Sequence, residues 1–196
     1  MTLDVHEKER TPHAFHEVVL ILAQAYEGLT GELPDARMLA VAAGIIGLEN
    51  GQGILIFGEN FGNVSARDGS VFPNTFHKDG EPSPEFFAWF PSADVGARAW
   101  WRLMLRRYRP VLAAAFDGDP QLAVRELYRL GYVVALRTGE EGDYARGVAS
   151  LARKAWPVAS QIGLTHVDRP AWQGAAALAA SVAAAVSAAF LARVAA

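Results

Sequence analysis

The chain contains no cysteine, so it forms no disulfide framework and carries out no thiolate chemistry. Several enzyme signatures are missing too: there is no HExxH metal-binding pair, no GxSxG nucleophile elbow, no P-loop and no GxGxxG turn after a strand. The five histidines show no spacing typical of a metal site. These absences exclude most other enzyme classes, and we expect neither a metal nor another cofactor.

An excess of positive charge is also missing. The formal net charge is −3, so the composition does not favour nucleic-acid binding. A signal peptide is not expected either, although residues 18–25 read VVLILAQA. Glu17 directly precedes this run, the segment before it is not basic, and the pattern continues as an amphipathic helix to Tyr26.

The remaining pattern predicts a mainly α fold with a small irregular or β lobe. Thr11 and Pro12 have the residue types of a helix N-cap and first helical position. The ten residues before them are mixed in charge and predict a flexible or cap-like tail. We expect an irregular middle up to Pro91 and helices over residues 12–28, 34–49, 92–109, 110–116, 120–130 and 143–156.

Glu49 is the most informative single residue. It is the first acid after a helix that is apolar on nearly every side, with no charge between Arg37 and Glu49; such a helix belongs in a core. Gly51 stands where a glycine would end the helix in a left-handed turn. The negative end of the helix dipole and the apolar neighbours both favour the protonated carboxylic acid, which is the form that donates a proton. A simple helix-end carboxylate, capping or paired with an arginine, is the alternative.

Four motifs follow one another in an order that is similar to the glucosaminidase branch of the lysozyme-like superfamily, whose members hydrolyse bacterial cell-wall glycan. The resemblance covers about residues 15–156. The motifs are LENGQG at 48–53, ENFGNVSA at 59–66, FAWFPSADVGARAW at 87–100 and LGYVVALRTGEEGDYARGV at 130–148. The GLMQ and AYN segments that lytic transglycosylases usually add to this scaffold are absent from the chain.

The resemblance implies a lysozyme-like α-helical domain and a set of site residues. Glu49 takes the place of the family's general acid, and Tyr132 that of the tyrosine in a GYxT-like turn. Residues that would bind the sugar or line its cleft are Asn60, Phe61, Asn63, Trp89 and Tyr144. Asn50 after the acid, and two valines after Tyr132, depart from the family pattern and leave the linkage specificity open.

A second carboxylate is the open point of the site. Between residues 66 and 91 the acids are Asp68, Asp79, Glu81 and Glu85, and we take Asp68 and Glu81 as catalytic candidates. An inverting glycosidase holds its two carboxyl groups about 6.5–9.5 Å apart. A substrate-assisted enzyme would instead use the sugar's own N-acetyl group and need no second acid.

The chain divides into a lysozyme-like glucosaminidase domain at 1–157, a linker at 158–170 and an Ala-rich apolar helix at 171–196. Residues 171–192 carry no charge, and their length suits a membrane span. Alanine partitions weakly, however, and Val182, Val186 and Phe190 form a narrow apolar stripe that also suits a packed helix. We therefore keep a membrane anchor, an oligomer or partner-protein helix, and a disordered tail as alternatives.

These features together predict a peptidoglycan hydrolase of the N-acetylglucosaminidase type that acts on glycan strands. A muramidase or lytic transglycosylase on the same scaffold, and a non-catalytic glycan-binding or structural module, are the alternatives. Without an export signal, we expect an envelope- or virion-associated protein that opens the wall locally, as in a phage or an envelope machine. Four arginines on one predicted helix are either a solvated face or a surface that attracts an anionic wall polymer: Arg102, Arg106, Arg107 and Arg109.

Overall fold

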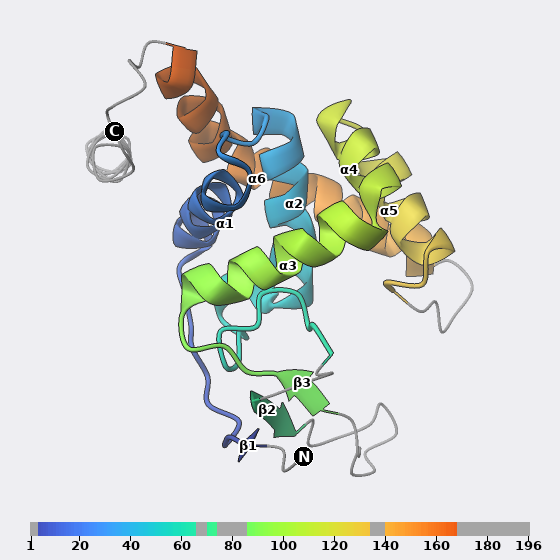
Figure 1. The fold of residues 1–196 in the computed structure, drawn as a ribbon. Helices are drawn as coiled ribbons and strands as arrows, with labels where there is room; N and C mark the ends of the chain where they lie inside the picture. The colour runs from blue at the N-terminus through green and yellow to red at the C-terminus, as the bar shows by residue number, and fades with distance from the viewer. Residues whose placement is uncertain (1–3, 66–69, 74–85, 134–139, 168–196) are drawn as a thin grey trace, which may run out of the picture.

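The computed structural model describes residues 4–65, 70–73, 86–133 and 140–167 (Figure 1). Within these ranges the fold is mainly helical with one small sheet, which confirms the predicted fold class at that level. A single 3-10 turn, η1, spans Gly51–Gly53. The α-helices are α1 Phe15–Thr30, α2 Ala36–Glu49, α3 Ala93–Arg107, α4 Arg109–Phe116, α5 Pro120–Arg129 and α6 Glu140–Val167.

The helix α2 forms the centre of the core. Every residue from Met38 to Gly47 is buried, as its all-round apolar sequence predicts. Its most extensive packing is against α6, with further contacts to α1 and α4 (Figure 1). Gly44 permits the close approach to α6, because a Cβ atom there would lie 2.6 Å from the carbonyl oxygen of Val148.

The helix α3 closes the core from another side with two adjacent tryptophans. Trp100 and Trp101 are fully buried, and the ring nitrogen of Trp101 donates a hydrogen bond to the Leu22 carbonyl at 2.8 Å. A buried indole needs such a partner, because its N–H is costly to leave unsatisfied. The bond therefore fixes α3 against α1.

The small lobe is a three-stranded sheet of order β1-β2-β3. Strand β1, Asp4–Val5, runs parallel to β2, Ser70–Pro73, and β2 runs antiparallel to β3, Phe86–Ala88. In the register, Val71 lies between Val5 on one side and Ala88 on the other. The sheet lies at the end of the molecule where α2 terminates (Figure 1).

The N-terminal segment is a correction to the sequence prediction, which expected a flexible or cap-like tail. After β1 the chain pairs with the segment that follows η1: Arg10 forms a bridge with Phe57, and the Thr11 amide donates to the Ile56 carbonyl at 2.9 Å. Thr11 is also not the N-cap of α1, since its hydroxyl accepts the Glu59 amide at 3.1 Å. The helix begins at Phe15 instead, where Glu17 accepts the Ala14 amide.

The helix α6 is longer than its sequence predicts. It continues through Pro157 to Val167, so the residues expected as a linker from 158 are helical as far as the structure describes them. Ala155, Ala159 and Ile162 are buried on both sides of the proline, and this packing outweighs the missing hydrogen-bond donor.

Residues 168–196, including the Ala-rich segment, lie outside the described residues. Among the helices that are described, none combines the length and hydropathy of a membrane span.

Candidate active site

Glu49 lies where α2 stops, as its sequence predicts. Asp35 caps the start of the helix by accepting the amides of Arg37 and Met38. At the other end the Asn50 amide bonds to the Ile46 carbonyl, and Gly51 takes a left-handed conformation with φ +56°. This turn ends the helix at the acid, with Asn50 as its C-cap. The half-buried carboxylate is thus held on a rigid element at the edge of the core.

Two side chains from distant elements hold the Glu49 carboxylate. The hydroxyl of Tyr144, near the start of α6, donates to Oε1 at 2.5 Å. The amide nitrogen of Asn63 donates to Oε2 at 3.2 Å. Donors on both oxygens hold the carboxyl group in one orientation.

Tyr144 stays a neutral phenol over the whole range of ordinary pH. Its burial raises the pKa of the hydroxyl well above the usual value of 10, and the negative charge of Glu49 raises it further. The ring packs edge-on against Tyr128 with centroids 5.8 Å apart. Tyr144 is therefore a fixed hydrogen-bond donor to the acid.

Tyr132, a predicted catalytic residue, forms its hydrogen bonds with residues other than Glu49. Its hydroxyl donates to the Gly62 carbonyl at 2.9 Å and accepts the ring N–H of Trp100 at 3.0 Å. Burial, followed by the charge of Glu49, raises the pKa of Tyr132 above 10. Both hydrogen-bonding directions of this hydroxyl are used within the protein. It joins α3 to the turn that presents Asn63.

An open pocket of about 470 Å³ lies in front of Glu49. It brings together the end of α2, the end of α5, the segment after α5 and the first turn of α6. Its lining is part apolar and part acidic, and consists of Leu48, Glu49, Tyr128, Val133, Glu140, Asp143 and Tyr144. This combination offers an aromatic wall and several carboxylates to a bound ligand.

Two of the pocket's carboxylates were missed by sequence reasoning. Glu140 and Asp143 line the pocket from the start of α6, whereas the sequence analysis predicted the second carboxylate between residues 66 and 91. Burial first, and then the charges of Glu140, Glu141 and Glu49, raise the pKa of Tyr128. Asp143 also pairs with Arg146. The sequence spacing indicates that Glu140 lies near Tyr144, because residues four apart share a helix face.

Two of the residues that were expected to contact sugar are buried inside the protein. Asn60 and Phe61 are 2% and 0% exposed, so neither side chain is open to a ligand here. The Asn60 amide instead donates to the carbonyls of Val64 and Ala88 and accepts the Val64 amide. These bonds build the turn on which Asn63 stands, and this structural role corrects the expectation of sugar contact.

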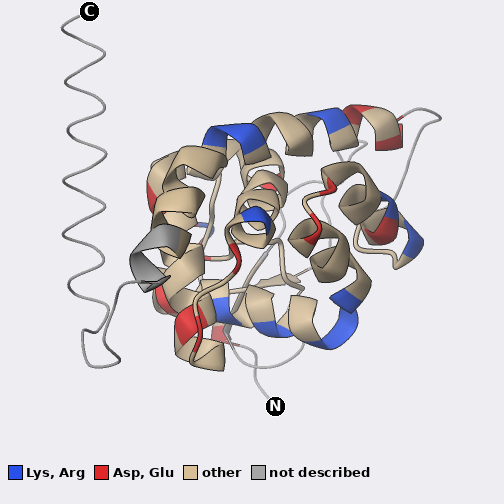
Figure 2. Cartoon of the chain, turned by 90° about the horizontal axis from the view of Figure 1, so that it is seen from above, with Lys and Arg blue, Asp and Glu red and all other residues tan. Residues whose placement is uncertain are grey.

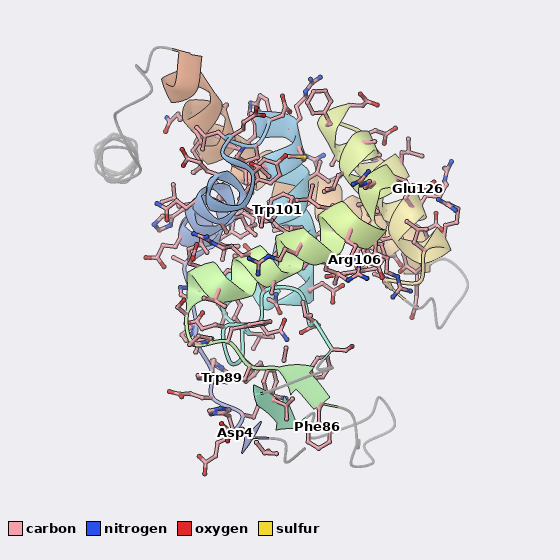
Figure 3. All side chains as sticks on the ribbon, viewed as in Figure 1. Asp4, Phe86, Trp89, Trp101, Arg106 and Glu126 are labelled. Atoms are coloured by element: carbon pink, nitrogen blue, oxygen red, sulfur yellow. The ribbon has the colours of Figure 1, made fainter. Side chains whose placement is uncertain are left out.

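Trp89 is likewise engaged within the protein. Its ring stacks on His6 with centroids 3.9 Å apart and an interplanar angle of 8°. Figure 3 places Trp89 at the same end of the molecule as Asp4 and Phe86, which belong to the small sheet. One face of the indole is thus covered by the N-terminal segment, and Trp89 does not line the pocket at Glu49.

The catalytic candidates Asp68 and Glu81, together with Asp79 and Glu85, lie outside the described residues. Within the described part of the chain, no group of three or more His, Asp or Glu side chains is arranged to hold a metal ion.

Comparison of the chain with protein-family models, with curated proteins and with solved structures finds no match.

Proposed function

We propose that this chain hydrolyses the glycan strand of peptidoglycan as an N-acetylglucosaminidase, with Glu49 as the general acid. The observation that carries the proposal is the placement of Glu49: a carboxylate at the end of a buried helix, bonded by Tyr144 and Asn63, at an open pocket. A glycosidase needs a carboxylic acid beside the scissile bond to protonate the leaving oxygen, and Glu49 would supply it.

The order of elements supports the finer fold assignment, a lysozyme-like domain. A core helix ends on the acid, a Gly- and Asn-rich turn follows, a small sheet comes next, and further helices close the site. The four motifs that resemble the glucosaminidases fall on these elements in the same order. The tyrosine of the last motif, Tyr144, bonds directly to the acid of the first.

The second half of the reaction needs a group that supports the oxocarbenium-like transition state or activates water. Glu140 and Asp143 stand in the same pocket as Glu49 and join Asp68 and Glu81 as candidates for this group. A substrate-assisted route, in which the sugar's N-acetyl group takes this part, remains the alternative. The cleaved strand would lie along the pocket, against Tyr128.

We place the enzyme in the cell envelope or on a virion, where it opens the wall locally. This placement is motivated by the appended segment at 171–196, for which a membrane anchor and a helix packed on a partner or a second copy are both proposed. Secretion of the free enzyme without that segment would contradict it.

The test is dye release from labelled, purified peptidoglycan by the wild type, Glu49→Gln and Glu141→Gln. Glu141 is exposed, lies beside the pocket and does not line it, so it controls for a general change of charge. We expect the wild type and Glu141→Gln to release dye and Glu49→Gln to lose at least about a hundredfold in rate, the order of a lost general acid. Equal rates for all three proteins would exclude Glu49 as the acid. No release by any of them, with circular dichroism showing folded protein, would favour a non-catalytic glycan-binding module.

A further inference from the structure

Three exposed arginines lie near the junction of α3 and α4: Arg102 and Arg106 on α3, and Arg109 as the first residue of α4. All three are exposed: Arg102 and Arg106 share a face of α3 at i and i+4, and Arg109 bonds back to the end of that helix at the Leu105 carbonyl. We call these three residues the stripe. Figure 2 shows the basic bands along α3, and Figure 3 marks Arg106 near the C-terminal end of this helix. The opposite face is buried through Trp100, Trp101 and Met104.

The stripe lacks the acidic partners that five of the other described arginines have. Arg125 and Arg129 on α5, and Arg146 on α6, each lie within 4.0 Å of a carboxylate. Among the described residues, by contrast, no carboxylate pairs with any of the three stripe arginines. Even Arg98, one turn before the stripe, is bonded to Asp94 at 2.9 Å.

An unpaired row of like charges has a cost in free energy. Like charges at i and i+4 repel each other and weaken a helix. The dipole of α3 offsets this for Arg106, which lies in the last turn. Arg102 is in mid-helix and receives no such compensation. An anionic partner along the stripe would remove the repulsion.

The guanidinium groups are ready to bind such a partner. Arg109 uses its Nε to bond to the Leu105 carbonyl at 2.9 Å, which fixes the side chain and leaves its other N–H groups available. A guanidinium fork matches phosphate oxygens with two parallel hydrogen bonds. None of the three lines the pocket at Glu49, so the stripe is a surface separate from the reaction site.

We propose that Arg102, Arg106 and Arg109 form a docking stripe for a phosphodiester polymer of the bacterial envelope, a chain with one phosphate in each repeat. Charge complementarity and the three successive guanidinium groups without a carboxylate partner favour a polyanion that offers several phosphates. The choice of an envelope polymer rests on the proposed function. Docking would raise the local concentration of the enzyme on walls that carry this polymer.

The test measures binding of the full chain to polyglycerol phosphate at low and moderate salt. The triple variant Arg102→Gln, Arg106→Gln, Arg109→Gln is compared with a matched triple, Arg125→Gln, Arg129→Gln, Arg146→Gln, which changes the net charge equally on other surfaces. We expect salt-sensitive binding by the wild type, a loss of about tenfold or more in affinity for the stripe triple, and a change of less than about threefold for the matched triple.

Four outcomes would overturn the proposal: no binding by the wild type, equal affinity of the stripe triple and the wild type, equal loss in both triples, or tighter binding of the wild type to double-stranded DNA than to the polymer. Dye release from polymer-free peptidoglycan separates this proposal from the proposed function. The stripe triple should release dye at the wild-type rate. Polymer binding through the stripe without any dye release would contradict the hydrolase and leave the docking stripe standing.

Discussion

The hydroxyl of Tyr144 is the group that most directly positions Glu49. It is part of α6, 95 residues away along the chain, and reaches the acid only because α6 packs along α2. The same side chain has no charge to contribute, because burial and the adjacent carboxylate hold its pKa above 10. Its contribution to the proposed reaction is therefore one hydrogen bond of fixed direction.

The first prediction removes that bond. Tyr144→Phe keeps the ring that packs on Tyr128 and deletes only the hydroxyl. A hydrogen bond to a charged group contributes about 1.5–3 kcal/mol, so the rate of dye release should fall roughly 10- to 100-fold while the fold is kept. Tyr26→Phe is the control, because Tyr26 packs edge-on against Trp101 and not at the pocket. A Tyr144→Phe enzyme with the wild-type rate would contradict the role given to this hydroxyl.

The sequence predicted individual site residues unevenly. Glu49 and Gly51 could be placed because a helix end is a local feature, encoded by an apolar run, an acid and a glycine. The burial of Asn60 could not be predicted, since an amide in a polar turn has the same sequence signature whether it faces a ligand or satisfies backbone groups. Glu140 was missed because its closeness to Glu49 depends on tertiary packing.

At the scale of elements, the contact between α2 and α6 determines the geometry of the site. α2 carries Glu49 and α6 carries Tyr144, so any change in the distance between the helices changes their hydrogen bond. Gly44 lies at the crossing, where the two backbones approach closely. Small residues at such a crossing permit the approach, whereas a larger one separates the helices.

Gly44→Ala should therefore destabilise the protein, although alanine is the better helix former. The added Cβ would lie 2.6 Å from a backbone oxygen and 3.1 Å from the Ala152 nitrogen, neither of which can move alone. We expect a loss of about 1–3 kcal/mol in the free energy of unfolding, measured with urea. Gly163→Ala is the matched control on the same helix pair: its Cβ would meet only Ala36 at an ordinary 3.6 Å. Equal stability of the two variants would show that α2 and α6 are further apart than described.

The order of the helices and the presence of a small lobe could be predicted from the sequence, but the strand pairing and the length of α6 could not. The 3.6-residue periodicity and the glycine and proline positions gave the helix order to within a few residues at most ends. The predictions for the N-terminal segment and for the length of α6 were wrong, because both depend on tertiary contacts. Strand β1 pairs with residues 66 positions away, and α6 passes through Pro157 because residues on both sides of it are buried.

For the whole molecule, several buried or partly buried tyrosines link stability to alkaline pH. Tyr132 and Tyr144 have pKa values raised above 10 in the folded chain, while an unfolded tyrosine releases its proton near pH 10. The folded state thus retains protons that the unfolded state loses. By linkage, their contribution to stability is fully present below pH 10 and is lost as the pH rises beyond it.

Up to pH 9, we expect the ionisation of these tyrosines to leave the free energy of unfolding nearly unchanged. Above pH 10, we expect the free energy of unfolding to fall. Each tyrosine contributes a slope of up to about 1.4 kcal/mol per pH unit. Urea unfolding at pH 9, 10 and 11 measures this slope. Tyr132→Phe should reduce the slope even though it lowers the stability at pH 9. A slope that is unchanged in this variant would mean that Tyr132 ionises normally in the folded protein.

The identity of the new reducing ends released from purified peptidoglycan tests the central claim most directly. Mass spectrometry would be applied to the fragments released by the wild type and by Glu49→Gln. The proposed function predicts N-acetylglucosamine at the new reducing end with the wild type, and no such fragments with Glu49→Gln. A new N-acetylmuramic acid end or an anhydro end would contradict the glucosaminidase assignment, and identical fragments from both proteins would contradict the role of Glu49.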